Sequence, residues 1–390
     1  MPGEPAPVPD PSARVDVDTV IVGAGPAGLA VAGCLRVAGL EFELVEREAN
    51  IAASWRRHYD RLHLHTVKSL SHLPYLPMPR DYPRYPSRDQ LVAYLEGYAR
   101  EFAIAPRLGV LVRGAQRRHG AWEVALANGA LRARNLVIAS GYNGAPHRPS
   151  WPGLSDFSGP VLHSSEYRSG ASFAGQQVLV VGIGNSGGEI ALDLHEAGAR
   201  VTMCVRSPVH ITPRDVNGLP AQVASLLLSG LPLRWADAVA RVTRRLNYGD
   251  LSRYGLETPE GGAITRIVER GRIPLIDIGT VARIRAGEIA VIGAIERFDV
   301  DGVQLADGER RAFDAVVLAT GYRASFDRFL EDAAAVSDDR GLPRVHGHEA
   351  TVPGLFFIGF RNPPTGALRE ITIEAQRIAG EILRKERSPA

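Results

Sequence analysis

The order of apolar runs, glycine-rich turns and helical patterns predicts a strand–turn–helix–strand unit near the start of the chain. An apolar run at 18–22 leads into a turn at 23–28. Helical periodicity follows at 29–38, and a second apolar run occupies 41–45. This spacing is typical of the first half of a Rossmann-like fold.

The same unit recurs later in the chain. Apolar runs at 177–181 and 200–205 lie on either side of a turn at 182–187 and a helical pattern at 189–196. Two copies this far apart indicate two separate domains and not a solenoid of short repeats. We therefore predict an α/β protein with two Rossmann-like dinucleotide-binding domains, the second inserted into the first.

The remaining pattern supplies the domain boundaries. It predicts helices at 87–101 and 372–385, strands at 136–140, 315–320 and 355–359, and a proline-rich connector at 146–153. We expect a flexible leader at 1–15, a first domain at 16–150 and 311–390, and an inserted domain at 151–310. The apolar stretch at 221–233 is interrupted by Gly230 and Pro232, and we expect a helix that covers the active site or lines a substrate tunnel; contact with a membrane surface is the alternative.

Composition and charge narrow the class of protein. The net charge of +2 argues against a nucleic-acid partner. No run reaches the roughly 18 apolar residues of a spanning helix, so we expect no stable membrane insertion. The leader lacks the pattern of a signal peptide. The two cysteines are far apart in the sequence, which excludes a CxxC redox pair, and their small number fits a location in the reducing cytoplasm. The histidines between 58 and 72 match no metal-ligand spacing, so no metal is predicted.

The first glycine-rich turn has the features of a dinucleotide site. Gly23 makes the tight turn, Gly25 lets the backbone approach a pyrophosphate, and Gly28 allows the helix and strand to pack closely. Glu46 ends the following strand, at the position of a carboxylate that binds a ribose. A glycine-rich turn beside a surface glutamate is the alternative.

The second turn differs in its final residue. Gly182, Gly184 and Gly187 repeat the glycine spacing, but the next strand leads into Arg206 and not into an acid. An arginine here can pair with a 2′-phosphate, which favours NADPH over NADH. Because arginine is abundant in this chain, an ordinary surface arginine is the alternative.

Two further features point to an active site. Only two of the 45 basic residues are lysines, Lys68 and Lys385. Lysine and arginine differ in shape and in how readily they lose charge, so the survival of Lys68 suggests a specific role. The segment at 157–167 contains His163 and Tyr167; alone it is a loop with a structural histidine at a domain junction.

The segment at 157–167 resembles the FxGxxxHxxxY fingerprint of class B flavin-dependent monooxygenases. Baeyer–Villiger monooxygenases have tryptophan at the position of Tyr167, and the turn at 319–322 is shared with the flavin monooxygenases. Segments in both folds resemble the YUCCA branch, the indole-3-pyruvate monooxygenases: 64–68, 182–194, 209–214, 254–256 and 274–280. His65 replaces the asparagine of many flavin monooxygenases.

The resemblance implies FAD in the first fold and NADPH in the second, with O₂ activated as a peroxide at flavin C4a. For FAD it implies contacts from Trp55, Val112, Thr320 and Gly359 in addition to the first turn and Glu46. For NADPH it implies Ser186, His163 and Tyr167 beside the second turn and Arg206. It implies catalytic roles for His65, Lys68 and Asn185.

The substrate implied is an aromatic 2-oxo acid such as indole-3-pyruvate, which loses its carboxyl carbon as CO₂. His65, Lys68 and Arg361 are the candidates to bind its carboxylate. Two alternatives remain open: oxygenation of a small amine or sulfide, and an NADPH-dependent flavin reductase without oxygen insertion. A non-catalytic FAD sensor is a further class. We expect a small-molecule substrate, and a homodimer is compatible with the sequence.

Overall fold

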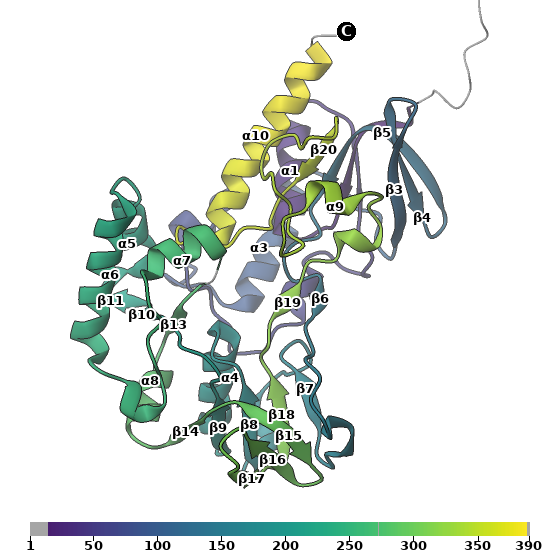
Figure 1. Cartoon of the computed structure of the whole chain (residues 1–390). Coiled ribbons are helices and arrows are strands. Elements are labelled where there is room, and N and C mark those ends of the chain that lie inside the picture. Colours follow the sequence, from purple (N-terminus) through teal and green to yellow (C-terminus); the bar gives the residue numbers. More distant parts are fainter. Residues whose placement is uncertain (1–14, 272, 388–390) are drawn as a thin grey trace, which may run out of the picture.

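The computed structural model describes residues 15–271 and 273–387. It contains two large sheets packed against helices and several smaller strand pairings (Figure 1). The first sheet has the order β2-β1-β5-β4-β3, with β20 paired to β5. Its strands are β1 (Val17–Val22), β2 (Phe42–Val45), β3 (Val112–Arg118), β4 (Ala121–Leu126), β5 (Gly129–Ile138) and β20 (Leu355–Phe357). The parallel pairing of β1 with β2 and β5 confirms the first predicted unit. Of the predicted leader, only Val15 is among the described residues.

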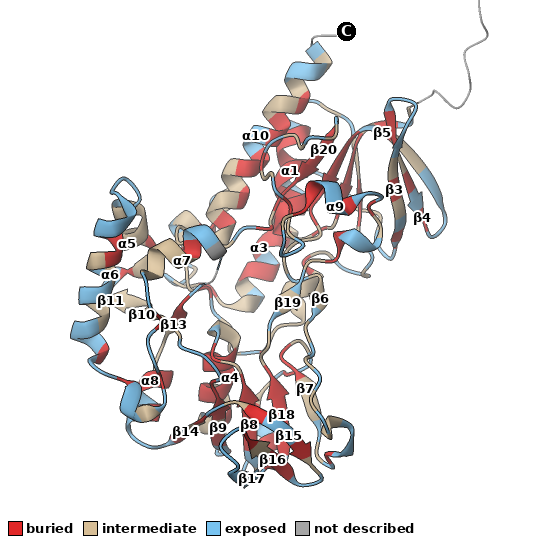
Figure 2. Ribbon diagram, in the orientation of Figure 1, coloured by how far each residue is buried: buried red, intermediate tan, exposed pale blue. Residues whose placement is uncertain are grey.

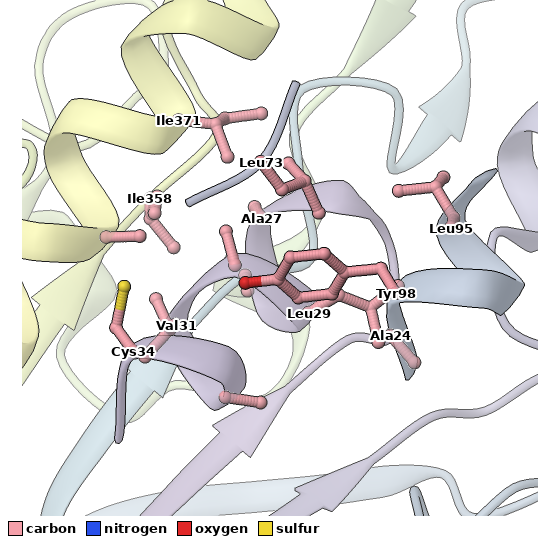
Figure 3. Close-up of a cluster of buried hydrophobic side chains, with 14 of the residues drawn as sticks. Ala24, Ala27, Leu29, Val31, Cys34, Leu73, Leu95, Tyr98, Ile358 and Ile371 are labelled. Carbon is pink, nitrogen blue, oxygen red and sulfur yellow. The ribbon is translucent and has the colours of Figure 1, made fainter. Parts of the chain in front are cut away.

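Helices α1 (Pro26–Val37), α3 (Arg88–Glu101) and α10 (Ala367–Arg387) pack together against this sheet. Figure 3 shows the centre of their interface, where Tyr98 of α3 lies beside Leu29 and Cys34 of α1. The α3 helix begins at a capping box, in which Ser87 and Gln90 satisfy each other's backbone N–H groups. The final helix starts at Ala367, before the predicted residue 372, and packs along α1.

The second sheet has the order β14-β9-β8-β18-β7 and is parallel throughout. Its strands are β7 (Val161–His163), β8 (Gln177–Val181), β9 (Arg200–Cys204), β14 (Ile289–Ile292) and β18 (Ala315–Leu318), and α4 (Asn185–Glu196) packs against it. β18 pairs with β8, so the second sheet extends beyond the predicted boundary at 310. That boundary is wrong because β18 completes the inserted sheet before the chain returns.

Short strands connect and extend the two folds. β6 (Ala145–Pro146) pairs with β19 (Tyr322–Arg323), where the chain leaves the first fold and where it comes back. An antiparallel ribbon packs against β8 and β18 of the second sheet. It consists of β15 (Ile295–Asp299), β16 (Gly302–Leu305) and β17 (Arg310–Ala312). Buried residues concentrate in the two sheets and in α1 (Figure 2).

A lobe of helices is inserted between β9 and β14 (Figure 1). It contains α5 (Ala221–Leu228), α6 (Leu233–Tyr248), α7 (Ala263–Arg270) and α8 (Thr280–Arg285), with β10 (Ile211–Pro213) paired to β13 (Leu275–Asp277) and β11 (Asp215–Val216) paired to β12 (Leu219–Pro220). The predicted helix at 221–233 is shorter than expected, because Pro232 precedes a new helix. None of the helices in the described ranges is long and apolar enough to cross a membrane.

Candidate cofactor and active site

The first glycine-rich turn has the geometry that its glycines predict. Gly23 has a φ of +108°, and a Cβ at Gly28 would lie 1.9 Å from the carbonyl oxygen of Gly23. Gly25 precedes α1, and a Cβ there would meet no atom within 4 Å. The first and third glycines are therefore required by the protein's own packing, whereas the space beside Gly25 is open for a ligand.

The second turn repeats this geometry. Gly182 has a φ of +111°, and a Cβ at Gly187 would lie 2.1 Å from its carbonyl oxygen. The space beside Gly184, which precedes α4, is open. Both turns thus place the N-terminus of a 12-residue helix at an uncovered backbone, which is the arrangement that accommodates a pyrophosphate. The residues present fit two dinucleotides.

A cavity of about 770 Å³ begins at the first turn and extends to the N-terminus of α4. Most predicted FAD residues line it: Gly23, Gly25, Glu46, Trp55, Val112 and Gly359. The predicted residues His65, Asn185 and Ser186 line it as well, from the loop between β2 and α3 of the first fold and from α4. The cavity therefore connects the two glycine-rich turns, as expected if a flavin and a nicotinamide meet between them.

Glu46 lies at the end of β2 within this cavity. One of its carboxylate oxygens accepts a hydrogen bond from Ala24 N–H at 2.7 Å, and the other accepts one from Glu48 N–H at 3.0 Å. These bonds fix the carboxylate beside the first turn. Contact between Glu46 and a ribose remains a prediction.

Buried titratable groups gather where the two folds meet. His65 Nε2 lies 2.7 Å from Glu189 Oε1, without the alignment of a hydrogen bond, and both side chains are largely buried. Tyr59 lines the same part of the cavity, and burial, followed by the Glu189 charge, raises its pKa well above its usual range. The sequence analysis missed Tyr59 and Glu189. A glutamate on the buried side of α4 was the available signal.

Two other residues line the cavity, and the structure indicates the protonation state of one, His58, and a hydrogen bond of the other, Asn185. Burial, and then the charges of Arg88 and Arg168, lowers the pKa of His58 to about 4, so its ring is neutral at physiological pH. The ring packs edge-on to Trp55 with 5.7 Å between centroids. Asn185 begins α4, and its side-chain oxygen accepts a hydrogen bond from Ile276 N–H at 2.8 Å. Asn185 thus ties the second turn to β13.

Lys68 does not line the cavity. Its ammonium group donates hydrogen bonds to the carbonyl oxygens of Pro79, at 3.4 Å, Arg80, at 2.7 Å, and Tyr82. Its ammonium group is thus bound by the loop at 79–82, and a position beside the flavin or the nicotinamide stays a prediction. Three converging carbonyls explain why a compact ammonium suits this position better than a planar guanidinium.

Three further residues that the sequence predicts to contact a cofactor have hydrogen-bond partners inside the protein. His163 is fully buried, with Nε2 donating to Gly321 O at 3.1 Å and Nδ1 accepting from Ser165 N–H at 3.1 Å. Tyr167 is 1% exposed and donates its hydroxyl hydrogen to Asp193 at 2.6 Å. Thr320 donates to the carbonyl oxygen of His147 and does not line the cavity. The polar atoms of these residues have partners inside the protein, and their contacts with NADPH and FAD stay predictions.

Arg206 is exposed directly after β9. It lies close enough to His147 that its charge, after burial and the charge of Arg323, lowers the pKa of His147. The positive charges of Arg206 and Arg323 therefore both lie near His147. The sequence analysis did not single out Arg323, which reaches this place through β19.

The family and the solved structures that this chain resembles agree with a fold of two nucleotide-binding domains. A family model described as pyridine nucleotide-disulphide oxidoreductase matches residues 20–218. A flavin monooxygenase mutant from Stenotrophomonas maltophilia superposes with a TM-score of 0.73 at 25% identity, covering 95% of this chain and 99% of the other. Cyclohexanone monooxygenase shares the fold, with a TM-score of 0.74 at 21% identity over 95% of this chain and 88% of the other. The fold is that of a class B flavoprotein monooxygenase.

The curated relatives define the branch. Indole-3-pyruvate monooxygenase YUCCA1 of Oryza sativa subsp. japonica is 44% identical over 84% of this chain and 82% of its own length. Probable indole-3-pyruvate monooxygenase YUCCA8 of Arabidopsis thaliana is 38% identical over 93% and 88%. The chain belongs to the YUCCA family of flavin monooxygenases. The predicted resemblance, fold class and enzyme class are confirmed, and the family fits FAD and NADPH as cofactors.

Proposed function

We propose that this enzyme uses FAD, NADPH and O₂ to convert an aromatic 2-oxo acid, such as indole-3-pyruvate, into the acid one carbon shorter. The overall reaction consumes one 2-oxo acid, O₂, NADPH and a proton, and releases the shortened acid, CO₂, water and NADP⁺. The cofactors supply the electrons and the activation of O₂. The single observation that carries the proposal is one cavity lined from both nucleotide folds, in a chain whose curated relatives are named for this substrate.

The protein's own contribution is binding, orientation and exclusion of water. Tyr59, His65 and Glu189 come from two different folds and are largely buried where the cavity passes between them. A contact of this kind across the two folds keeps the reacting centre closed to solvent, which limits loss of the activated oxygen. Glu189 also lies 2.7 Å from Nε2 of His65, which brings the His65 ring close to α4.

Arg361 is the cation that we assign to the substrate carboxylate. It lines the cavity beside Asn362, directly after the Gly359 turn, and it has no acidic partner within 4 Å among the described residues. Of the other two candidates, Lys68 does not line the cavity and is hydrogen-bonded to backbone carbonyls, and His65 is next to Glu189. A carboxylate would give Arg361 a charge-assisted, bidentate partner.

The substrate class is tested by measuring CO₂ release and NADPH oxidation with indole-3-pyruvate and phenylpyruvate, beside an amine and a thioether. We expect coupled decarboxylation of the 2-oxo acids. Hydrogen peroxide from the 2-oxo acids, together with clean oxygenation of the amine or thioether, would instead support the heteroatom-oxidising alternative. Reduction of FAD without oxygen transfer to any substrate would support the reductase.

The role of Arg361 is tested by Arg361→Ala. Losing one charge-assisted contact costs about 1.5–3 kcal/mol, so KM for the 2-oxo acid should rise roughly ten- to a hundredfold. Arg344→Ala is the matched control, since Arg344 is exposed and does not line the cavity. KM values that are equal in the two variants would remove Arg361 from the substrate site.

A further inference from the structure

A second cavity of about 580 Å³ lies inside the helical lobe and shares no lining residue with the cavity between the nucleotide folds. Its walls come from β10, from α6 and from the loop that leads into α7. A volume of this size is typical of a site for a small molecule and is too small for a macromolecule. Neither the residues of the two nucleotide turns nor Arg361 lines this cavity.

The charge of the cavity wall is strongly positive. Arg234, Arg241 and Arg244 all line the cavity from α6. In the described part of the chain, no acidic group lies within 4 Å of these three guanidinium groups. Arg234 and Arg241 are exposed and Arg244 is half-buried, and Asp237 is the one carboxylate among the lining residues. This excess of positive charge would attract an anion into the cavity.

The one acidic residue of the wall already has partners. Asp237 is 6% exposed and accepts hydrogen bonds from Ile264 N–H at 2.7 Å, Thr265 N–H at 3.2 Å and the Thr265 hydroxyl at 2.6 Å. These bonds cap the start of α7 and join it to α6. Glu260, in the neighbouring loop, is exposed and does not line the cavity. Among the described residues, no carboxylate therefore pairs with these arginines within 4 Å. Asp250, an exposed acid whose pKa is lowered by hydrogen bonds from Ser252 and then by the Arg244 charge, is outside the cavity lining.

Two nitrogen atoms in the wall are buried without a hydrogen-bond partner, Arg244 Nε and His210 Nε2. Burial, and then the charges of Arg266 and Arg244, lowers the pKa of His210, so its ring remains a neutral hydrogen-bonding group. A buried polar atom without a partner costs free energy, and a ligand with several oxygen atoms could give each of these nitrogens an acceptor.

We propose that this cavity binds a small free anion carrying two or more phosphate or carboxylate groups. Arg244 and His210 would bind it at the buried end, and Arg234 and Arg241 at the outer end. The bound anion would connect α6 with β10 and so stabilise the lobe, because a ligand that binds only the folded state raises its stability.

The experiment uses the enzyme saturated with FAD and NADP⁺, so that both nucleotide sites are filled. Pyrophosphate and citrate are titrated at constant ionic strength by calorimetry, and thermal unfolding is followed in parallel. We expect saturable binding of at least one of them and a higher unfolding temperature. Arg244→Gln and Arg241→Gln should each weaken binding about tenfold or more, as for a lost charge-assisted contact.

Arg245→Gln is the matched control. Arg245 is the next residue of the same helix, carries the same charge, is exposed and does not line the cavity. Its removal should leave the affinity unchanged within about twofold. Equal weakening by Arg245→Gln and Arg244→Gln would show diffuse attraction to a basic surface and overturn the proposal. Absence of saturable binding to the wild type, or binding to phosphatidate vesicles alone, would overturn it as well.

Discussion

Glu374 of α10 gives a quantitative test of how the first fold is held together. Its side chain is 2% exposed, and one carboxylate oxygen has no hydrogen-bond partner. The other oxygen lies 3.5 Å from Gly359 N–H, at the turn that lines the cofactor cavity. Burial raises the pKa of Glu374 from 4.5 to about 7, against the opposing effects of the Gly359 N–H and the Arg361 charge.

The direction of the pH effect follows from this raised pKa. Between pH 4.5 and about 7, the folded state binds the proton of Glu374 more tightly than the unfolded state does. The contribution of Glu374 to the free energy of unfolding is therefore greatest below pH 4.5 and is lost as the pH rises to about 7. At about 1.4 kcal/mol per pH unit, the full change is about 3 kcal/mol.

Glu374→Gln removes the titration and keeps the shape of the side chain. Urea unfolding at about pH 5 and about pH 8 should show that the wild type loses about 2.5 kcal/mol more than the variant, since part of the full change falls below pH 5. Glu101→Gln makes the same chemical change at an exposed position at the end of α3 and should follow the wild type. If the Glu374→Gln and wild-type curves run parallel, the carboxyl is not desolvated in the folded state and the reasoning fails.

Four substitutions test other parts of the structure. Gly25→Ala should give a folded but colourless protein, because its methyl group meets open space in the protein and the pyrophosphate in the complex; full FAD occupancy, read from the flavin spectrum, would contradict this. Arg206→Ala should weaken NADPH about ten- to a hundredfold and leave NADH nearly unchanged, as measured by the two KM values. Lys68→Met should lower the unfolding temperature, because the hydrogen bonds to the loop at 79–82 are lost, and NADPH oxidation should stay coupled to product formation. Uncoupled NADPH oxidation at wild-type stability would instead support an active-site role for Lys68. Tyr167→Phe should destabilise the second fold by about 1 kcal/mol with unchanged coenzyme KM.

The two glycine-rich turns could be predicted from sequence because their requirements are local. The positive φ of Gly23 and the contact between Gly23 and Gly28 involve residues only five positions apart, and the flanking strand and helix have clear periodicity. The same holds for Gly182 and Gly187. Local conformation and packing within one unit of the fold leave few alternatives to glycine at these positions.

The candidate site was predicted less completely, because partners distant in the sequence decide what a polar side chain does. The His163 ring is hydrogen-bonded to the carbonyl oxygen of Gly321, which lies 158 residues later in the sequence, and this contact occupies its Nε2 atom. The carbonyls around Lys68 come from the loop at 79–82, whose path has no signature in the sequence. Neither partner could be identified from the motif that contains the residue.

The sequence by itself determined the fold class, the two nucleotide turns and the family, since glycine spacing and hydrophobic periodicity are properties of neighbouring residues. Only the tertiary structure decided which side chains reach the cavity between the folds. It brought Glu189 of the second fold against His65 of the first, and it placed β18 in the inserted sheet. Long-range packing fixes the direction and the hydrogen-bond partners of each buried polar group, and those two properties separate a binding residue from a structural one.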